Sequence, residues 1–154
     1  MKRNPLRLPC FLLSLASLGW ILVTPVDAET ARAEKGMVAT VHPLATDAGV
    51  AVLEKGGNAV DAAIAAGLML GVVDNHNSGI GGGCFILIRR ADGQLFAIDG
   101  REMAPAAAHR DMYLEEGKPQ GQWSRTGALA SGVPGALAAY ERAVSDHGRT
   151  AWSE

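Results

Sequence analysis

Apolar and polar positions follow helical spacing in the first half of the chain and predict two consecutive helices. Apolar or small residues recur in this way over residues 45–53, and the Gly-Gly pair at 56–57 ends the pattern. Residues 59–73 follow, with Asn58 as N-cap residue and Asp61, their single charged residue, in the first turn. Because this second helix has no polar face, we expect it to be buried on nearly every side within a large layered domain.

Three other segments have the apolar pattern of strands. Residues 84–89 and 95–99 flank an Asp-Gly pair at 92–93, which is a strong signal for a hairpin turn. An isolated run at residues 36–41 also predicts a short strand, which Pro43 ends because proline has no backbone N–H for a ladder. The sequence therefore predicts one hairpin and one separate strand.

The last third of the chain predicts an exposed connection and a third helix. Residues 111–122 are charged and carry glycine and proline, which is typical of a surface connection. Gly135 and Gly148 flank a segment whose apolar residues recur at helical spacing, with charged residues on the opposite side. We therefore expect a helix between these two glycines.

The first 28 residues have the pattern of a secretory signal. Three basic residues among the first seven precede an apolar run at residues 11–23, and small residues lead to a cleavage position after Ala28. The run is shorter than the roughly 20 residues of a membrane-spanning helix, so a lasting anchor is disfavoured. We expect a signal peptide at 1–28 and an exported segment at 29–154, with the periplasm as destination and secretion as the alternative.

Charge and residue usage exclude several classes of function. The formal net charge is −2 and no basic block occurs, which argues against a nucleic-acid partner. The four histidines show no metal-ligand spacing and no cysteine pair accompanies them. Cys10 leaves with the predicted signal, so Cys84 cannot form an internal disulfide. Cys84 opens an apolar run with no basic neighbour, which favours a small buried side chain over a nucleophile.

The glycine-rich run at residues 79–83 does not fit a nucleotide loop. A dinucleotide fingerprint starting at Gly79 requires glycine at position 84, which is Cys84, and the Gly-Lys-Ser/Thr ending of a P-loop is absent. The run also follows a predicted helix and precedes a strand, the reverse of the nucleotide context. A flexible turn remains, or a backbone pressed close to a ligand or to another chain segment.

Arg101 is the candidate binding residue, because it follows the second hairpin strand at a strand-to-loop junction. A guanidinium offers a planar pair of donors that binds a carboxylate through two parallel hydrogen bonds. The alternative is a surface arginine paired with Glu102 or Asp99. The position alone leaves both interpretations open.

Five short segments, in order, resemble the N-terminal part of the γ-glutamyltranspeptidase family. The resemblance runs from about Glu34 to the end of the chain, and each motif is weak alone but specific as a series. The segments are Gly-Met-Val-Ala at 36–39, Gly-Gly-Asn-Ala-Val-Asp-Ala-Ala at 56–63, Ser-Gly-Ile-Gly-Gly-Gly at 78–83, Asp-Gly-Arg-Glu-Met-Ala-Pro at 99–105 and Ser-Gly-Val-Pro-Gly at 131–135.

The resemblance implies an α+β fold, the α-β-β-α sandwich of N-terminal nucleophile hydrolases, present here only as its N-terminal portion. It implies a precursor that cuts itself into a large and a small subunit. The N-terminal threonine of the small subunit attacks a γ-glutamyl amide, and the acyl group passes to water, an amino acid or a peptide. The resemblance implies neither metal nor organic cofactor.

The resemblance assigns Arg101 to the α-carboxylate of a small-molecule γ-glutamyl donor, with Glu102 in a supporting role. No catalytic residue falls within this chain, so we expect it to be inactive without the small subunit of the same precursor, its expected partner. Two alternatives remain: an acylase of the same superfamily that removes β-lactam side chains, and a truncated remnant without enzymatic activity.

Overall fold

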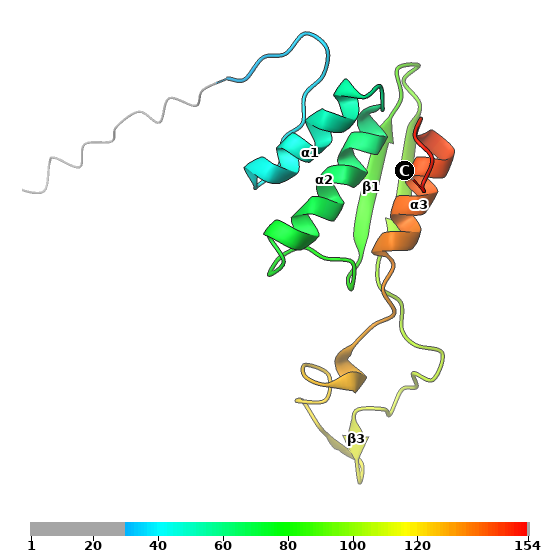
Figure 1. Ribbon diagram of the computed structural model, residues 1–154. Helices are drawn as coiled ribbons and strands as arrows, with labels where there is room; N and C mark the ends of the chain where they lie inside the picture. Colours follow the sequence, from blue (N-terminus) through cyan, green and yellow to red (C-terminus); the bar gives the residue numbers. More distant parts are fainter. Residues whose placement is uncertain (1–29, 154) are drawn as a thin grey trace, which may run out of the picture. The chain divides into compact units, whose positions relative to one another are not determined.

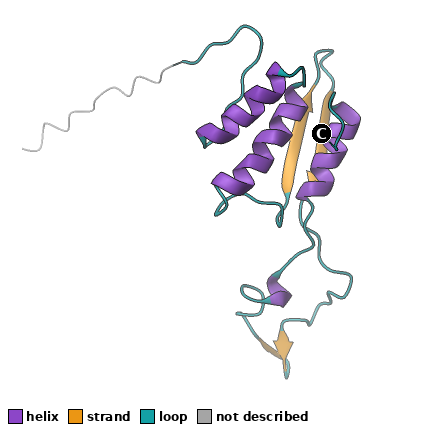
Figure 2. Ribbon diagram, in the orientation of Figure 1, coloured by secondary structure: helices purple, strands orange, loops and turns teal. Residues whose placement is uncertain are grey.

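A computed structural model describes residues 30–153, and Ala33–Glu154 form one compact unit to which the contacts below belong. The predicted signal peptide and Cys10 lie outside the described residues. Helices and strands mix along the chain (Figures 1 and 2), in the order α1 (Pro43–Glu54), α2 (Ala59–Val73), β1 (Cys84–Arg89), β2 (Leu95–Gly100), β3 (Leu114–Glu115), β4 (Lys118–Pro119), the 3-10 helix η1 (Ala128–Ala130) and α3 (Ala136–His147). No helix among residues 30–153 is long and apolar enough to cross a membrane.

The two predicted helices of the first half are confirmed, and local caps explain their ends. His42 Nδ1 accepts a hydrogen bond from the backbone N–H of Leu44 at the start of α1, and Gly56 follows the helix with a φ of +95°. At the start of α2, the side chain of Asn58 accepts from the N–H of Asp61, whose carboxylate accepts in turn from the N–H of Asn58. This reciprocal capping box begins α2 at the residue that the sequence predicts.

The predicted hairpin is also confirmed. Strands β1 and β2 pair antiparallel, from Cys84 opposite Gly100 to Arg89 opposite Leu95. Gly93 lies in the connecting turn with a φ of +87°, a conformation that favours glycine. Pairing in this register places Gly100, the last residue of β2, beside the start of β1.

The core lies on one face of the hairpin. Ile64 of α2, Ile88 of β1, and Ala143 and Val144 of α3 form a buried cluster. Partly buried apolar side chains of both strands and both helices pack around it: Val60, Ile86, Phe96, Ile98 and Tyr140. The alternate strand positions point the other way, and Phe85 and Leu87 are 65% and 83% exposed. Both α2 and α3 therefore cover the same face, while α1 packs against α2.

One prediction from the sequence is wrong, and one stays open. Residues 36–41 form no strand, because strand structure requires hydrogen bonds to a neighbouring strand and no described segment pairs with them. Helix α2 is only partly covered by the described residues, since four of its fifteen residues are buried and Val72 is 74% exposed. Its burial on nearly every side stays a prediction, because that prediction concerns a larger domain than residues 30–153 form. The described residues cover α2 with α1, α3 and the hairpin, which leaves the remainder of its apolar surface open.

The connection between β2 and α3 is mostly exposed, as the sequence predicts. It contains the short antiparallel pair β3–β4, turned at Glu116 and Gly117, and then η1. Its two ends meet, because the backbones of Met103 and Val133 exchange hydrogen bonds of 3.1 and 2.8 Å. This isolated bridge brings residues 131–135 back to the end of β2.

Candidate functional site

The candidate site is built on the Arg101 loop, by which we mean residues 100–103 at the end of β2. Gly100 is buried, whereas Arg101 and Glu102 are exposed. The backbone N–H of Arg101 donates to Asp99 Oδ1 over 3.0 Å, which fixes the direction in which the chain leaves the strand. As the sequence predicts, Arg101 stands just beyond a strand end.

The glycine-rich run lies directly against the Arg101 loop. A Cβ atom added at Gly83 would lie 2.7 Å from the carbonyl oxygen of Gly100 and 2.8 Å from Arg101 Cα. The carbonyl oxygen of Gly82 accepts hydrogen bonds of 3.1 Å from the N–H groups of Gly135 and Ala136. Of the interpretations of this run, close approach to another chain segment is therefore the correct one for Gly83.

The Ser-Gly-Val-Pro-Gly segment contacts the Arg101 loop as well. A Cβ atom added at Gly132 would lie 3.0 Å from Glu102 Cβ. One added at Gly135 would overlap the carbonyl oxygen of Gly100 and lie 2.8 Å from that of Arg101. Glycines from two distant motifs thus surround one short loop, and a side chain at Gly83 or Gly135 would displace its backbone.

The guanidinium of Arg101 is available to bind a ligand. Within residues 30–153 it makes no hydrogen bond or salt bridge, so neither Glu102 nor Asp99 pairs with it. The surface-pair alternative is therefore not realised in the described part of the chain. A free guanidinium on a fixed backbone suits a carboxylate ligand.

The carboxylate of Glu102 turns toward the glycine-rich run. Its Oε1 lies 3.4 Å from the position of a Cβ atom added at Gly82, and its Oε2 lies 2.7 Å from one added at Gly83. No hydrogen bond joins Glu102 to the Arg101 side chain among the described residues. The supporting role of Glu102 stays a prediction.

Cys84 lies next to the Arg101 loop, at the start of β1. Burial raises the pKa of its thiol above the ordinary value of 9.0, and the nearby charge of Glu102 raises this pKa further. The thiol is therefore protonated at neutral pH, which is unfavourable for a nucleophile. The protonated thiol agrees with the prediction against a nucleophile, whereas the predicted burial is only partial, since Cys84 is half-buried.

We expect Cys84 to react with iodoacetamide at pH 7.5 more slowly than free cysteine, because its raised pKa lowers the fraction of thiolate and only the thiolate reacts. The measurement is mass spectrometry of the peptide that contains Cys84, in the folded protein and after unfolding in urea. Unfolding should remove the protection. Alkylation in the folded protein at the rate of free cysteine would contradict the assignment.

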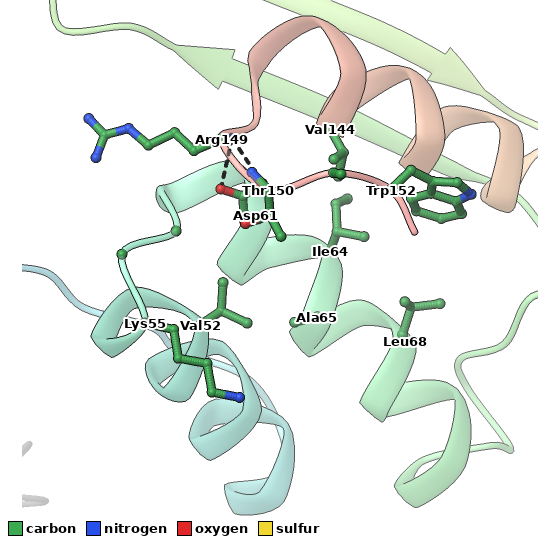
Figure 3. A pocket seen from close by; sticks show the side chains of 13 residues that line it. Val52, Lys55, Asp61, Ile64, Ala65, Leu68, Val144, Arg149, Thr150 and Trp152 are labelled. Carbon is green, nitrogen blue, oxygen red and sulfur yellow. Dashed lines mark hydrogen bonds between the residues drawn. The ribbon is translucent and has the colours of Figure 1, made fainter. Parts of the chain in front are cut away.

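Two cavities among the described residues differ in their relation to the Arg101 loop. A small one of about 230 Å³ is open to solvent and is lined by Glu102 and Met103 of that loop, together with side chains from residues 104–113 and 129–132. A larger one of about 600 Å³ lies between the C-terminal end of α1, one side of α2 and residues 149–152 (Figure 3). Asp61 and Trp152 line the larger cavity, which includes no residue of the Arg101 loop.

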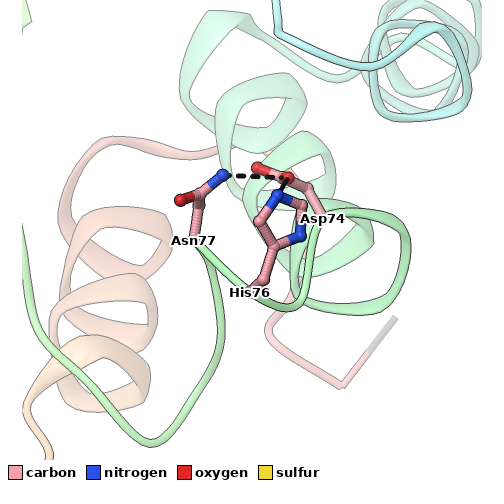
Figure 4. A network of polar contacts seen from close by, with 3 residues as sticks. All are labelled: Asp74, His76 and Asn77. Atoms are coloured by element: carbon pink, nitrogen blue, oxygen red, sulfur yellow. Dashed lines mark hydrogen bonds and ion pairs between the residues drawn. The ribbon is translucent and has the colours of Figure 1, made fainter.

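The turn between α2 and the glycine-rich run is fixed by a polar network (Figure 4). Asp74 Oδ1 lies 3.3 Å from His76 Nε2 and accepts a hydrogen bond of 3.2 Å from Asn77 Nδ2. The described residues contain no group of three or more histidines, cysteines or acidic residues that could hold a metal ion. The polar contacts of Asp74 thus stabilise the turn that leads from α2 into the glycine-rich run.

Comparison with known proteins gives one consistent result. A family model described as "Gamma-glutamyltranspeptidase" matches residues 45–154. The glutathione hydrolase proenzyme of Escherichia coli (strain K12) is 50% identical over 118 residues, which cover 76% of this chain and 20% of that protein. This chain thus spans about a fifth of the length of the curated relatives that it matches.

Solved structures agree with this result. The γ-glutamyltranspeptidase of Helicobacter pylori superimposes with a TM-score of 0.75 and 41% sequence identity, over 79% of this chain and 35% of that one. A cephalosporin acylase from Bacillus halodurans superimposes with a TM-score of 0.61 and 27% identity, over 80% and 24%.

Proposed function

The chain belongs to the γ-glutamyltranspeptidase family, and from this premise we propose that it forms the donor-binding part of an enzyme that transfers γ-glutamyl groups. The donor is glutathione or another γ-glutamyl compound, and the acceptor is water, an amino acid or a peptide. The fold class predicted from the sequence is confirmed, since the matching structures have the N-terminal nucleophile hydrolase fold and the chain corresponds to its N-terminal portion.

The free guanidinium of Arg101 is the observation that carries this proposal. Its backbone is fixed by contacts from Gly83 and Gly135, while its side chain has no partner among residues 30–153. A γ-glutamyl donor differs from an ordinary peptide by its free α-carboxylate, which matches the two parallel donors of an arginine. Fixing that end of the donor orients the remote γ-amide toward a nucleophile.

The proposal assigns the chemical step to a threonine outside this chain. That threonine becomes the N-terminus of a small subunit when the precursor cuts itself, and it needs no cofactor. Relatives named as proenzymes support this division of labour. Residues 1–28 then direct export, and residues 29–154 belong to the large subunit and are inactive alone. Reading the coding frame beyond Glu154 tests this part, since an immediate stop codon would favour the remnant without activity.

Replacing Arg101 with alanine in the full-length enzyme should lower kcat/KM for a γ-glutamyl anilide by about 10- to 150-fold, the value of a charged hydrogen-bonded pair of roughly 1.5–3 kcal/mol. Arg101→Lys should recover part of the loss, because lysine keeps the charge without the planar pair of donors. The exposed Arg110, changed to alanine, is the matched control and should leave kcat/KM unchanged.

A donor whose α-carboxylate is an amide makes this test specific. The unaltered enzyme should prefer the carboxylate donor strongly, and Arg101→Ala should abolish most of that preference. If the variant discriminates between the two donors as well as the unaltered enzyme does, Arg101 does not bind the α-carboxylate.

A second candidate function is removal of a β-lactam side chain, favoured by the structural match to a cephalosporin acylase. A glutaryl side chain also presents a carboxylate, so Arg101 is compatible with both substrates. Rates measured on a γ-glutamyl anilide and on a glutaryl-β-lactam separate the two. The donor that carries an α-amino group should be preferred by a γ-glutamyltransferase.

A further inference from the structure

We propose that helix α3 positions Arg101 for donor binding, with Ala139 and Gly135 as positioning residues; this inference rests on the proposed function of Arg101. Glycine has no side chain and alanine has a single methyl group, so neither residue is expected to contact the donor itself. Both act through direct contact between α3 and the backbone of the Arg101 loop.

The first contact joins the end of β2 to the middle of α3. Gly100 is buried, and a Cβ atom added there would overlap the Cβ of Ala139, which is itself 3% exposed. It would also lie 3.2 Å from the carbonyl oxygen and the Sγ of Cys84. Strand and helix therefore meet without an intervening side chain at the residue that precedes Arg101, and a shift of α3 moves that residue with it.

The second contact lies at the N-cap of α3. Gly135 is packed against the carbonyl groups of both Gly100 and Arg101, which flank the Cα of Arg101 on its two sides. The same N-cap donates to the carbonyl oxygen of Gly82, so the glycine-rich run and α3 enclose the loop together. The φ and ψ angles of Arg101 are thus limited by its neighbours rather than by its own side chain.

The other end of α3 is anchored in the core. Ala143 is fully buried and Val144 is 7% exposed, and both belong to the buried cluster that also contains Ile64 of α2 and Ile88 of β1. Since α3 is continuous from Ala136 to His147, it connects this core to the Arg101 loop as one rigid element. A displacement of about 1 Å at a binding residue can cost about a hundredfold in catalytic efficiency, so a shift of α3 that moves Arg101 should weaken donor binding.

The test is a double-mutant cycle in the full-length enzyme, made of Gly100→Ala, Ala139→Gly and the pair. Gly100→Ala alone should raise the donor KM about tenfold or more, while kcat at saturating donor changes less than about threefold. Ala139→Gly removes the atom that the new methyl group meets, so the pair should recover most of the loss. The contact with Cys84 should leave a small remainder.

Ala138→Gly is the matched control for the cycle. It introduces the same helix-destabilising glycine on α3 at an exposed position, and it should not rescue Gly100→Ala. If Gly100→Ala does not fold, Ala139→Ser adds one atom from the helix side and should raise the donor KM by a smaller factor at an unchanged kcat.

The outcomes separate this inference from the proposed function. An unchanged donor KM in Gly100→Ala, or in Ala139→Ser if it is the variant used, overturns the positioning role. So does a pair that is no better than Gly100→Ala, or rescue by Ala138→Gly. These results leave the proposed function intact as long as Arg101→Ala loses its preference for the α-carboxylate. If Arg101→Ala keeps that preference, the proposed function itself fails.

Discussion

Replacing Asp61 with alanine should release residues 148–152 from the N-terminus of α2. Asp61 is 5% exposed, and its carboxylate accepts a hydrogen bond of 2.7 Å from the N–H of Asn58. The carboxylate also accepts hydrogen bonds of 3.0–3.3 Å from the N–H groups of Arg149 and Thr150 (Figure 3). Hydrogen bonds to a charged group contribute about 1.5–3 kcal/mol each, and their removal leaves several donors unsatisfied. We expect a loss of more than about 3 kcal/mol in local stability, over a hundredfold in the opening equilibrium.

Hydrogen exchange of the backbone amides measures this loss directly. Peptides that cover residues 148–152 should exchange over a hundredfold faster in Asp61→Ala than in the unaltered protein, while amides of β1 change much less. Asp47→Asn, a change at an exposed acid on α1, is the control and should alter no exchange rate beyond its own turn. Equal protection of residues 148–152 in Asp61→Ala would show that Asp61 does not hold this segment.

The same carboxylate predicts a dependence on pH. Burial acts to raise the pKa of Asp61, but hydrogen bonds from Asn58, Arg149 and Thr150 outweigh it, and the pKa is lowered from its ordinary value of 3.8. A group whose pKa is lowered in the folded state makes its full contribution to stability at pH values above its pKa in the unfolded state. The protection of residues 148–152 from hydrogen exchange should therefore stay constant at pH values more than about one unit above 3.8. It should fall as the pH drops below 3.8 toward the pKa of Asp61 in the folded state.

Local signals explain which parts of this fold could be predicted. Asn58 and Asp61 stand three residues apart at the start of an apolar run, and the capping box that they form is a local interaction. The Asp-Gly pair at 92–93 predicts the hairpin for the same reason, because the turn selects its own residues. Residues 36–41 show the limit of such signals, since a strand also needs a partner that its own sequence does not specify.

The site was predictable only in part. Arg101 could be located from its place after a strand and from the resemblance. That its guanidinium pairs with none of the residues the structure describes is a property of the fold and not of the local sequence. A glycine in the sequence can indicate that another backbone segment comes close to it, but it does not indicate which segment this is. The link between Asp61 and Arg149 spans 88 residues of sequence, and no local pattern announces a contact of that range.

Gly83→Ala should impair donor binding as strongly as any single change in this chain. The new Cβ atom would lie 2.7 Å from the carbonyl oxygen of Gly100 and 2.8 Å from Arg101 Cα, and neither backbone atom can rotate away. Overpacking of this kind costs up to about 3 kcal/mol, which corresponds to over a hundredfold in kcat/KM if the Arg101 loop carries the whole displacement. The measurement is donor kcat/KM in the full-length enzyme.

Gly81 offers a matched control two residues away in the same run. Within residues 30–153, a Cβ atom added at Gly81 lies within 4 Å of nothing beyond its own chain neighbours. Gly81→Ala therefore carries the same chemical change and the same loss of backbone freedom without the contact. Its donor kcat/KM should stay within about twofold of the unaltered enzyme. Equal effects at both positions would mean that flexibility of the run matters and its contact with the Arg101 loop does not. A loss of donor kcat/KM in Gly83→Ala alone would instead show that donor binding depends on the contact between the backbone of Gly83 and the Arg101 loop.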